Sequence, residues 1–147
     1  MTAGETIYER AGREEGLGRI VAVFYASIFE DPVLQPVFGT PVPTHVDHLT
    51  AFLCEVFGGP TRYSDELGGF DSIVEIHRGK HISEEQRQRF HDLFMAAVDQ
   101  TEAGQDAQLR AAIESCIDFG THVAMVNSNA TTDAELHPQR VVPHWEW

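Results

Sequence analysis

The chain has 147 residues, of which 42% are hydrophobic, and a formal net charge of −13. This length is enough for one domain with its own core, and the negative charge argues against nucleic acid as a partner, because it would repel the phosphates. No apolar run approaches the roughly 20 residues of a membrane span, and the start lacks the basic and apolar regions of a secretory signal, so we expect a cytoplasmic protein without membrane contact.

The first half of the chain predicts three helices and one proline-rich segment. A short helix over about 4–11 precedes a stronger one over about 15–30, in which apolar residues recur at helical spacing. Four prolines within 32–43 exclude a long regular element there. A third helix opens at Pro43 or Thr44 and is stopped by Gly58-Gly59-Pro60.

The second half predicts three more helices. A loop with four glycines, 58–69, leads into a short helix from Gly69 to His77. Ser83 is followed three residues later by Gln86, a capping-box pattern that starts a helix ending near residue 100. A last helix covers about 106–128. Because no alternating strand pattern appears, the predicted fold class is all-α.

The tail and the two cysteines carry weaker signals. Residues 129–147 are punctuated by prolines, so we expect an extended tail whose Trp145 and Trp147 either dock on the body or stay mobile. Cys54 and Cys116 each lie among apolar helical residues, away from any metal-binding spacing, which predicts buried, reduced thiols.

Two apolar helix faces each carry a histidine. His77 ends a stripe with Phe70, Ile73 and Val74, and His45 begins a stripe with Leu49, Phe52 and Val56. A single histidine on such a face is most often a core residue bonded to a carbonyl group. Two imidazoles on two apolar faces are also what a chain needs to hold an iron cofactor between helices.

Several short motifs resemble those of the truncated haemoglobins when their order and spacing are taken together. The resemblance spans residues 7–128 and rests on the following segments: Phe24-Tyr25, Phe38, Phe52-Leu53, Gly58-Gly59-Pro60, Tyr63-Ser64 and the run from His77 to Ser83. The double glycine and the tail with Leu136-His137-Pro138, Pro143 and Trp145 are most similar to the group II branch. The resemblance implies a globin-like two-over-two helical sandwich enclosing haem b, as a domain over 1–128 followed by the tail 129–147.

The resemblance also implies roles for individual residues. His77 matches the proximal histidine, the one protein ligand of the iron, and Tyr25 matches the distal tyrosine that reaches the bound gas. His45 falls at the distal-helix position nearest the gas. Phe90 stands where group II members usually carry tryptophan, so one distal N–H donor is missing. The apolar contacts expected around haem come from Phe38, Leu49, Phe52, Ile73 and Phe90.

The haem propionates need cationic or hydroxylic partners near the His77 helix. The candidates are Tyr63, Arg78, Lys80 and His81, and Arg62 is a weaker one.

The function implied is binding of dioxygen and other diatomic ligands, with nitric oxide, carbon monoxide or peroxide as further small partners. Nitric oxide dioxygenation or peroxidase-type chemistry would use Tyr25 and His45 as the catalytic pair, and sustained turnover would need an external reductant because the chain contains no reductase domain. Two alternatives stay open: a haem-free globin-like sensor or interaction module, and a resting state in which His45 also ligates the iron.

Overall fold

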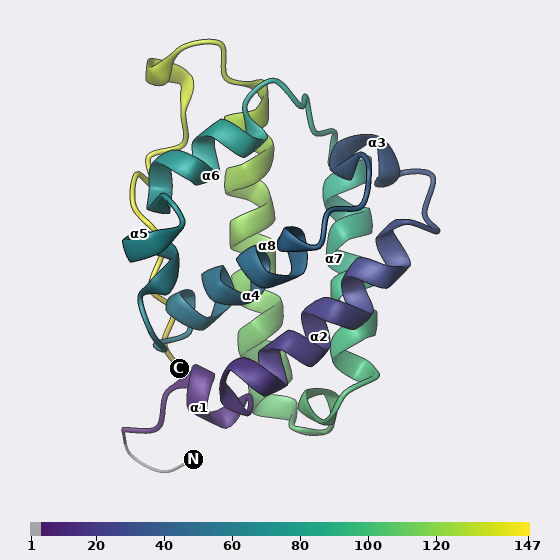
Figure 1. Cartoon of the computed structure of the whole chain (residues 1–147), viewed down its shortest axis with the longest axis vertical. Helices are drawn as coiled ribbons and strands as arrows, with labels where there is room; N and C mark the ends of the chain where they lie inside the picture. Colours follow the sequence, from purple (N-terminus) through teal and green to yellow (C-terminus); the bar gives the residue numbers. More distant parts are fainter. Residues whose placement is uncertain (1–3) are drawn as a thin grey trace.

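The computed structural model describes residues 4–147, and within them every regular element is a helix or a 3-10 turn. The first three residues, with which the predicted domain 1–128 begins, lie outside the described residues. Helices α2 (Arg13–Ile28) and α4 (Thr44–Val56) form one layer, which crosses a second layer made of α7 (Glu84–Asp99) and α8 (Ala107–Asn129) (Figure 1). The all-α prediction is therefore confirmed. No helix within residues 4–147 is long and apolar enough to cross a membrane.

The core lies between the two layers, where α2 contacts both α4 and α7, and α7 packs on α8. The apolar residues that predicted α2 are all buried in the structure: Leu17, Ile20, Val21, Phe24 and Ile28. Burial of one such side chain contributes about 1.5–3 kcal/mol, so this face alone anchors the helix. Phe57 and Phe94 are the other phenylalanines that are almost fully buried.

Side-chain caps fix where several helices begin. The predicted capping box is present at α7, since the Ser83 hydroxyl accepts from the backbone N–H of Gln86, whose side chain accepts in return from the N–H of Ser83. Thr6 and Glu9 form the same arrangement at α1 (Ile7–Arg10). These reciprocal bonds satisfy N–H groups that have no partner inside a helix.

Two short helices were not predicted. Helix α3 (Gln35–Phe38) forms inside the proline-rich segment, where a proline in the first turn costs no backbone hydrogen bond. Helix α5 (Arg62–Glu66) forms inside the glycine loop. The local sequence provides no side-chain cap for α5. The buried Glu55 of α4 takes that place, because its carboxylate accepts from both the backbone N–H (2.8 Å) and the hydroxyl of Ser64.

The turn between α1 and α2 depends on glycine. Gly12 has φ +92°, a left-handed conformation that other residues rarely adopt. A Cβ atom on Gly16 would lie 1.9 Å from the carbonyl oxygen of Ala11. The α1 backbone can therefore rest against α2 only where a side chain is missing.

A buried carboxylate ties the α2–α3 turn to α7. Asp31 accepts from the backbone N–H groups of Val33 (2.9 Å) and Leu34 (3.2 Å) and pairs with Arg89. Burial alone would raise the pKa of Asp31, but the bonds from Arg89 and the two N–H groups hold that pKa below its ordinary value. The carboxylate therefore stays charged while buried.

The tail has no regular element apart from a short 3-10 turn, η2 (Asp133–Glu135). It runs back along the molecule and ends beside α1 (Figure 1). The backbone N–H of Trp145 donates to Val56 O at 2.7 Å, and the indole N–H of Trp147 donates to Glu5 O at 2.8 Å. Both tryptophans are thus docked on the body.

Both cysteines are free and buried, in agreement with the prediction. Burial raises the pKa of the Cys54 thiol to about 11 and that of the Cys116 thiol to about 12. Both groups are therefore protonated near neutral pH and poorly nucleophilic.

Candidate functional site

His77 is the last residue of helix α6 (Gly69–His77), and its ring is held by that helix. The Nδ1–H group donates to the carbonyl oxygen of Ile73, four residues earlier, at 2.8 Å. Burial lowers the pKa of His77 more than the bond to Ile73 raises it. The imidazole is therefore neutral at pH 7, and the bond at Nδ1 leaves the Nε2 lone pair free for a metal.

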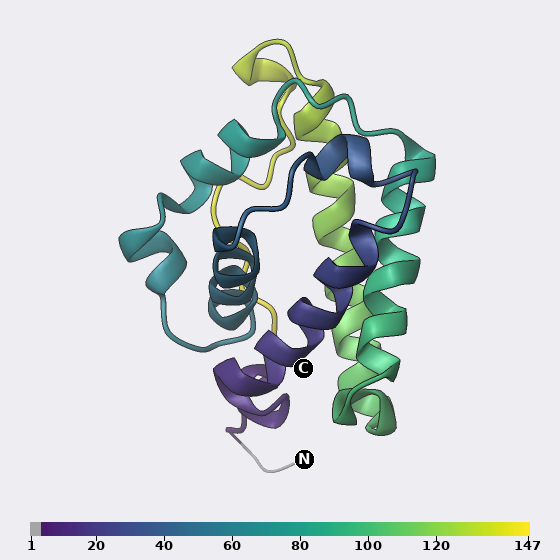
Figure 2. The same ribbon diagram turned by 45° about the vertical axis from the view of Figure 1, so that its right-hand side comes forward.

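The apolar stripe that carries His77 is only partly covered by protein. Phe70, Ile73 and Val74 are half-buried, because α6 packs mainly on α5 and α8. Leu49 and Phe52 on α4 are half-buried too. Figure 2 shows α6 and α4 as separate arms joined through α5. Two apolar helix faces thus retain surface that a flat apolar group would cover.

Tyr25 of α2 and His45 of α4 form a pair. The tyrosine hydroxyl is hydrogen-bonded to Nδ1 of the histidine, and the two ring centroids lie 5.4 Å apart with the planes at 82°. Burial, followed by the nearby charges of His48 and Lys80, lowers the pKa of His45. A neutral imidazole and a phenol together carry two hydrogen-bond donors, and their mutual bond uses one. One N–H or O–H therefore remains for a third group.

Aromatic side chains fill the space behind this pair. Phe38 stacks on Phe90 with centroids 6.2 Å apart, and both contact Phe24 edge-on, at 6.5 and 4.6 Å. Tyr25 also contacts Phe38 at 6.1 Å. The structure thus brings Phe38 and Phe90 together beside Tyr25, and Phe90 contributes no hydrogen-bond donor there.

The five candidate propionate partners differ in what they already bind. Arg62 pairs with Asp47 at 2.8 Å, and Arg78 pairs with Asp133 at 2.8 Å. Lys80, the only lysine of the chain, donates to the carbonyl oxygen of Val37 at 3.0 Å, and no ion pair with a carboxylate is found for it among the described residues. Of these three cations, Lys80 is the one whose charge is not paired with a carboxylate among the described residues.

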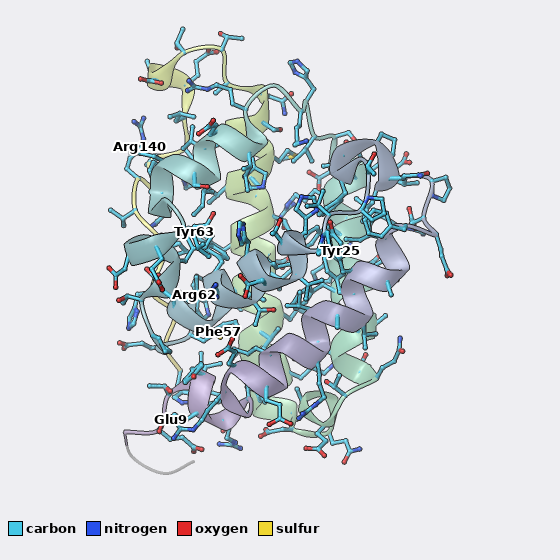
Figure 3. All side chains as sticks on the ribbon, in the orientation of Figure 1. Glu9, Tyr25, Phe57, Arg62, Tyr63 and Arg140 are labelled. Atoms are coloured by element: carbon cyan, nitrogen blue, oxygen red, sulfur yellow. The ribbon has the colours of Figure 1, made fainter. Side chains whose placement is uncertain are left out.

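The other two candidates differ in burial. Tyr63 is buried against Phe52, with ring centroids 5.3 Å apart, and His81 is exposed. Figure 3 shows Tyr25 near the start of α4 and Tyr63 nearer the end of that helix. Of these two, only His81 has an exposed side chain.

The crossed helix pairs, with a neutral histidine on one apolar face and a tyrosine–histidine pair on another, have the architecture of a globin. The family model described as bacterial-like globin matches residues 6–126. The chain therefore belongs to the bacterial-like globin family.

Solved structures and sequence relatives agree on this assignment. The haemoglobin of Chloroflexus aurantiacus is 28% identical and has a TM-score of 0.73, over 82% of this chain and 98% of that one. A group II truncated haemoglobin from Bacillus anthracis superimposes with a TM-score of 0.76 over 90% of this chain and 99% of that one, and at 23% identity it shows the fold alone.

The group 1 truncated haemoglobin GlbN of Nostoc commune is 36% identical over 80 residues, which is 54% of this chain and 64% of that relative. The chain thus covers less than two thirds of the length of this curated relative. Because a group 1 relative and a group II structure both appear, the group II assignment remains a prediction.

Haem b is the cofactor of this family, and the residues present fit it. The neutral His77 offers Nε2 as an iron ligand, and the partly covered apolar faces of α4 and α6 match a porphyrin ring. Lys80, which has no carboxylate partner among the described residues, carries a charge that could pair with a carboxylate of the cofactor.

Proposed function

We propose that the chain binds haem b through His77 and holds dioxygen and other diatomic gases reversibly on the opposite side. The observation that carries this proposal is the His77 ring: its Nδ1–H is occupied by Ile73 O at 2.8 Å, and its pKa is lowered. Such a ring presents a lone pair without first losing a proton. The bound haem would supply the iron site for the gas.

The distal residues would supply a single oriented hydrogen bond. Because Tyr25 and His45 are bonded to each other, one donor of the pair is left to reach a gas molecule in the pocket. A hydrogen bond to an acceptor that carries partial charge contributes about 1.5–3 kcal/mol, a factor of roughly 10 to 150 in affinity. Phe38, Leu49 and Phe90 would exclude water, which strengthens this bond further.

Redox chemistry is a second part of the proposal. The same pair can donate or accept a proton through its free donor, as peroxidase-type cleavage of an O–O bond or nitric oxide dioxygenation would require. An external reductant would have to restore the iron after each turnover. In a stopped-flow experiment, the oxygen-loaded protein mixed with nitric oxide should convert within the mixing time to the ferric form with nitrate as product. An oxygen-loaded spectrum that survives the mixing would refute the dioxygenase activity.

The competing function is a haem-free sensor or interaction module. It predicts that side chains fill the space beside His77, whereas the apolar residues on the same stripe are only half-buried. We therefore favour the haem-binding function, carried by a domain over 1–128 with 129–147 as its tail. The direct test is haem uptake by the purified chain, followed by titration with carbon monoxide. A protein without a Soret band after reconstitution would exclude the haem-binding function.

A further inference from the structure

The turn that follows His77 has an unusual backbone. Gly79 has φ +85° and His81 has φ +50°, so a non-glycine residue adopts the left-handed conformation two positions after a glycine that does the same. The carbonyl oxygen of His77 accepts from the N–H of Lys80 at 3.1 Å, which makes His77 itself part of the turn. Such a conformation persists only where surrounding contacts hold it.

Ser128, at the end of α8, supplies those contacts. Its carbonyl oxygen accepts from the N–H groups of Gly79 (3.1 Å) and His81 (3.3 Å). Its hydroxyl accepts from the N–H of Ile82 at 2.9 Å and donates to Met125 O at 2.8 Å. Ser128 is fully buried. One residue therefore binds three backbone donors of the five-residue segment that follows His77.

Neighbouring residues secure the same junction. Asn129 Nδ2 donates to the carbonyl oxygen of Ile82 at 3.1 Å, whereas Ser128 binds the N–H of the same residue. Asn127 Oδ1 accepts from the backbone N–H of His137 at 2.9 Å, which fixes the tail against this end of α8. The last turn of α8 thus holds both the His77 turn and the tail.

A terminal helical residue is held less firmly than an interior one. His77 is the last residue of α6, so no further helical turn follows it, and its backbone position depends on where the next residues are attached. A shift of the 78–82 segment would move the backbone that carries the imidazole. The bond to Ile73 orients the ring within α6 but does not relate α6 to α8.

We propose that Ser128 is a positioning residue for His77, which sets the reach and orientation of the imidazole toward the haem iron through the 78–82 turn. This inference rests on the proposed function, in which His77 is the iron ligand. Residues that orient a metal ligand typically change metal affinity 10- to 100-fold when they are removed. We expect the lower part of this range, because the Ser128 carbonyl group remains in any side-chain variant.

The test compares Ser128→Ala with Ser115→Ala, an exposed serine on the same helix. Three properties are measured: the rate of haem transfer to an excess of an acceptor apoglobin, the iron–histidine stretching band in the resonance Raman spectrum of the reduced protein, and the thermal unfolding midpoint. For Ser128→Ala we expect haem loss about tenfold faster and a shifted or broadened band, whereas Ser115→Ala should match the wild type.

A second variant guards against misfolding of the first. Asn129→Ala removes the exposed donor to Ile82 O and should shift the band in the same direction by a smaller amount. A lower unfolding midpoint with an unchanged band and unchanged haem loss would make the role of Ser128 merely structural and overturn the proposal. If Ser128→Ala does not fold, an unchanged band in Asn129→Ala overturns it. If the wild type takes up no haem, the proposed function itself fails. That result differs from one in which the wild type binds haem and the Ser128 variant behaves like it.

Discussion

Replacement of Tyr25 by phenylalanine tests the proposed role of the Tyr25–His45 pair in holding the gas. The ring and its contacts with Phe29 and Phe38 would remain, at centroid distances of 4.9 and 6.1 Å, so only the hydroxyl bonded to His45 Nδ1 is lost. His45 would then keep one N–H as a neutral imidazole, but nothing would choose its tautomer or fix its ring. A donor would still be present without its orientation.

The expected magnitude follows from the one donor that the pair leaves free. One oriented hydrogen bond to the gas contributes about 1.5–3 kcal/mol, so Tyr25→Phe should raise the dioxygen dissociation rate roughly 10- to 150-fold. His45→Leu should have a similar effect, because the donor is oriented only when both residues are present. The double variant should lose much less than the sum of the two, with a coupling energy of about 1 kcal/mol or more.

The assay is stopped-flow replacement of dioxygen by carbon monoxide in the reduced protein, for the wild type, both single variants and the double variant. Tyr8→Phe is the matched control, since Tyr8 is a half-buried tyrosine that lies against Gly59, beyond the last residue of α4. Strictly additive losses would show two independent donors and refute the mutually bonded pair. Unchanged rates in both single variants would refute any distal hydrogen bond from these residues.

Other expectations concern stability and are measured by thermal or urea unfolding. Gly16→Ala should destabilise the protein by about 1–3 kcal/mol, because the added Cβ would lie 1.9 Å from a backbone oxygen. Gly120→Ala is the control: its Cβ would meet open space, so it should stabilise the protein by about 0.5–1 kcal/mol. Equal effects of the two variants would contradict the turn geometry. Because the pKa of Asp31 is lowered in the folded state, its contribution to folding stability is complete above the ordinary value of 3.8 and is lost as the pH falls through the native pKa. Asp31→Asn should therefore cost about 1.5 kcal/mol at pH 7 and weaken the loss of stability at acid pH. If stability falls with acid as steeply as in the wild type, Asp31 does not have this role. Trp147→Ala should cost about 1–2 kcal/mol, through the lost bond to the N-terminal backbone and the contact with Arg10 at 5.5 Å; no loss would mean that the tail is not docked in solution.

The main helices could be read from the sequence because periodicity and capping are local signals. The stripe that ends at His77 predicts α6 with the same bounds as the structure, and Ser83 with Gln86 predicts the start of α7. Helix α5 could not be read in this way, because it is five residues long and depends on Glu55, nine positions before Ser64. A contact between segments carries no periodic signal in either of them.

The same distinction applies to the site. The bond between His77 and Ile73 follows from helical geometry, since the two residues are four positions apart. The attachment of Lys80 to Val37 O, and of the 79–82 backbone to Ser128, depends on long-range packing that spacing does not reveal. The only sequence signal for the latter is the polar run 127–129 that ends this amphipathic helix.

The most direct test of haem binding through His77 is an absorption spectrum of the reconstituted protein, taken ferric, then reduced, then under carbon monoxide, for the wild type beside His77→Ala. We predict a Soret band that sharpens and shifts with carbon monoxide in the wild type, with haem lost or loosely held in the variant. A wild-type protein without a Soret band, or a variant whose three spectra match those of the wild type, would contradict the assignment of His77 as the iron ligand.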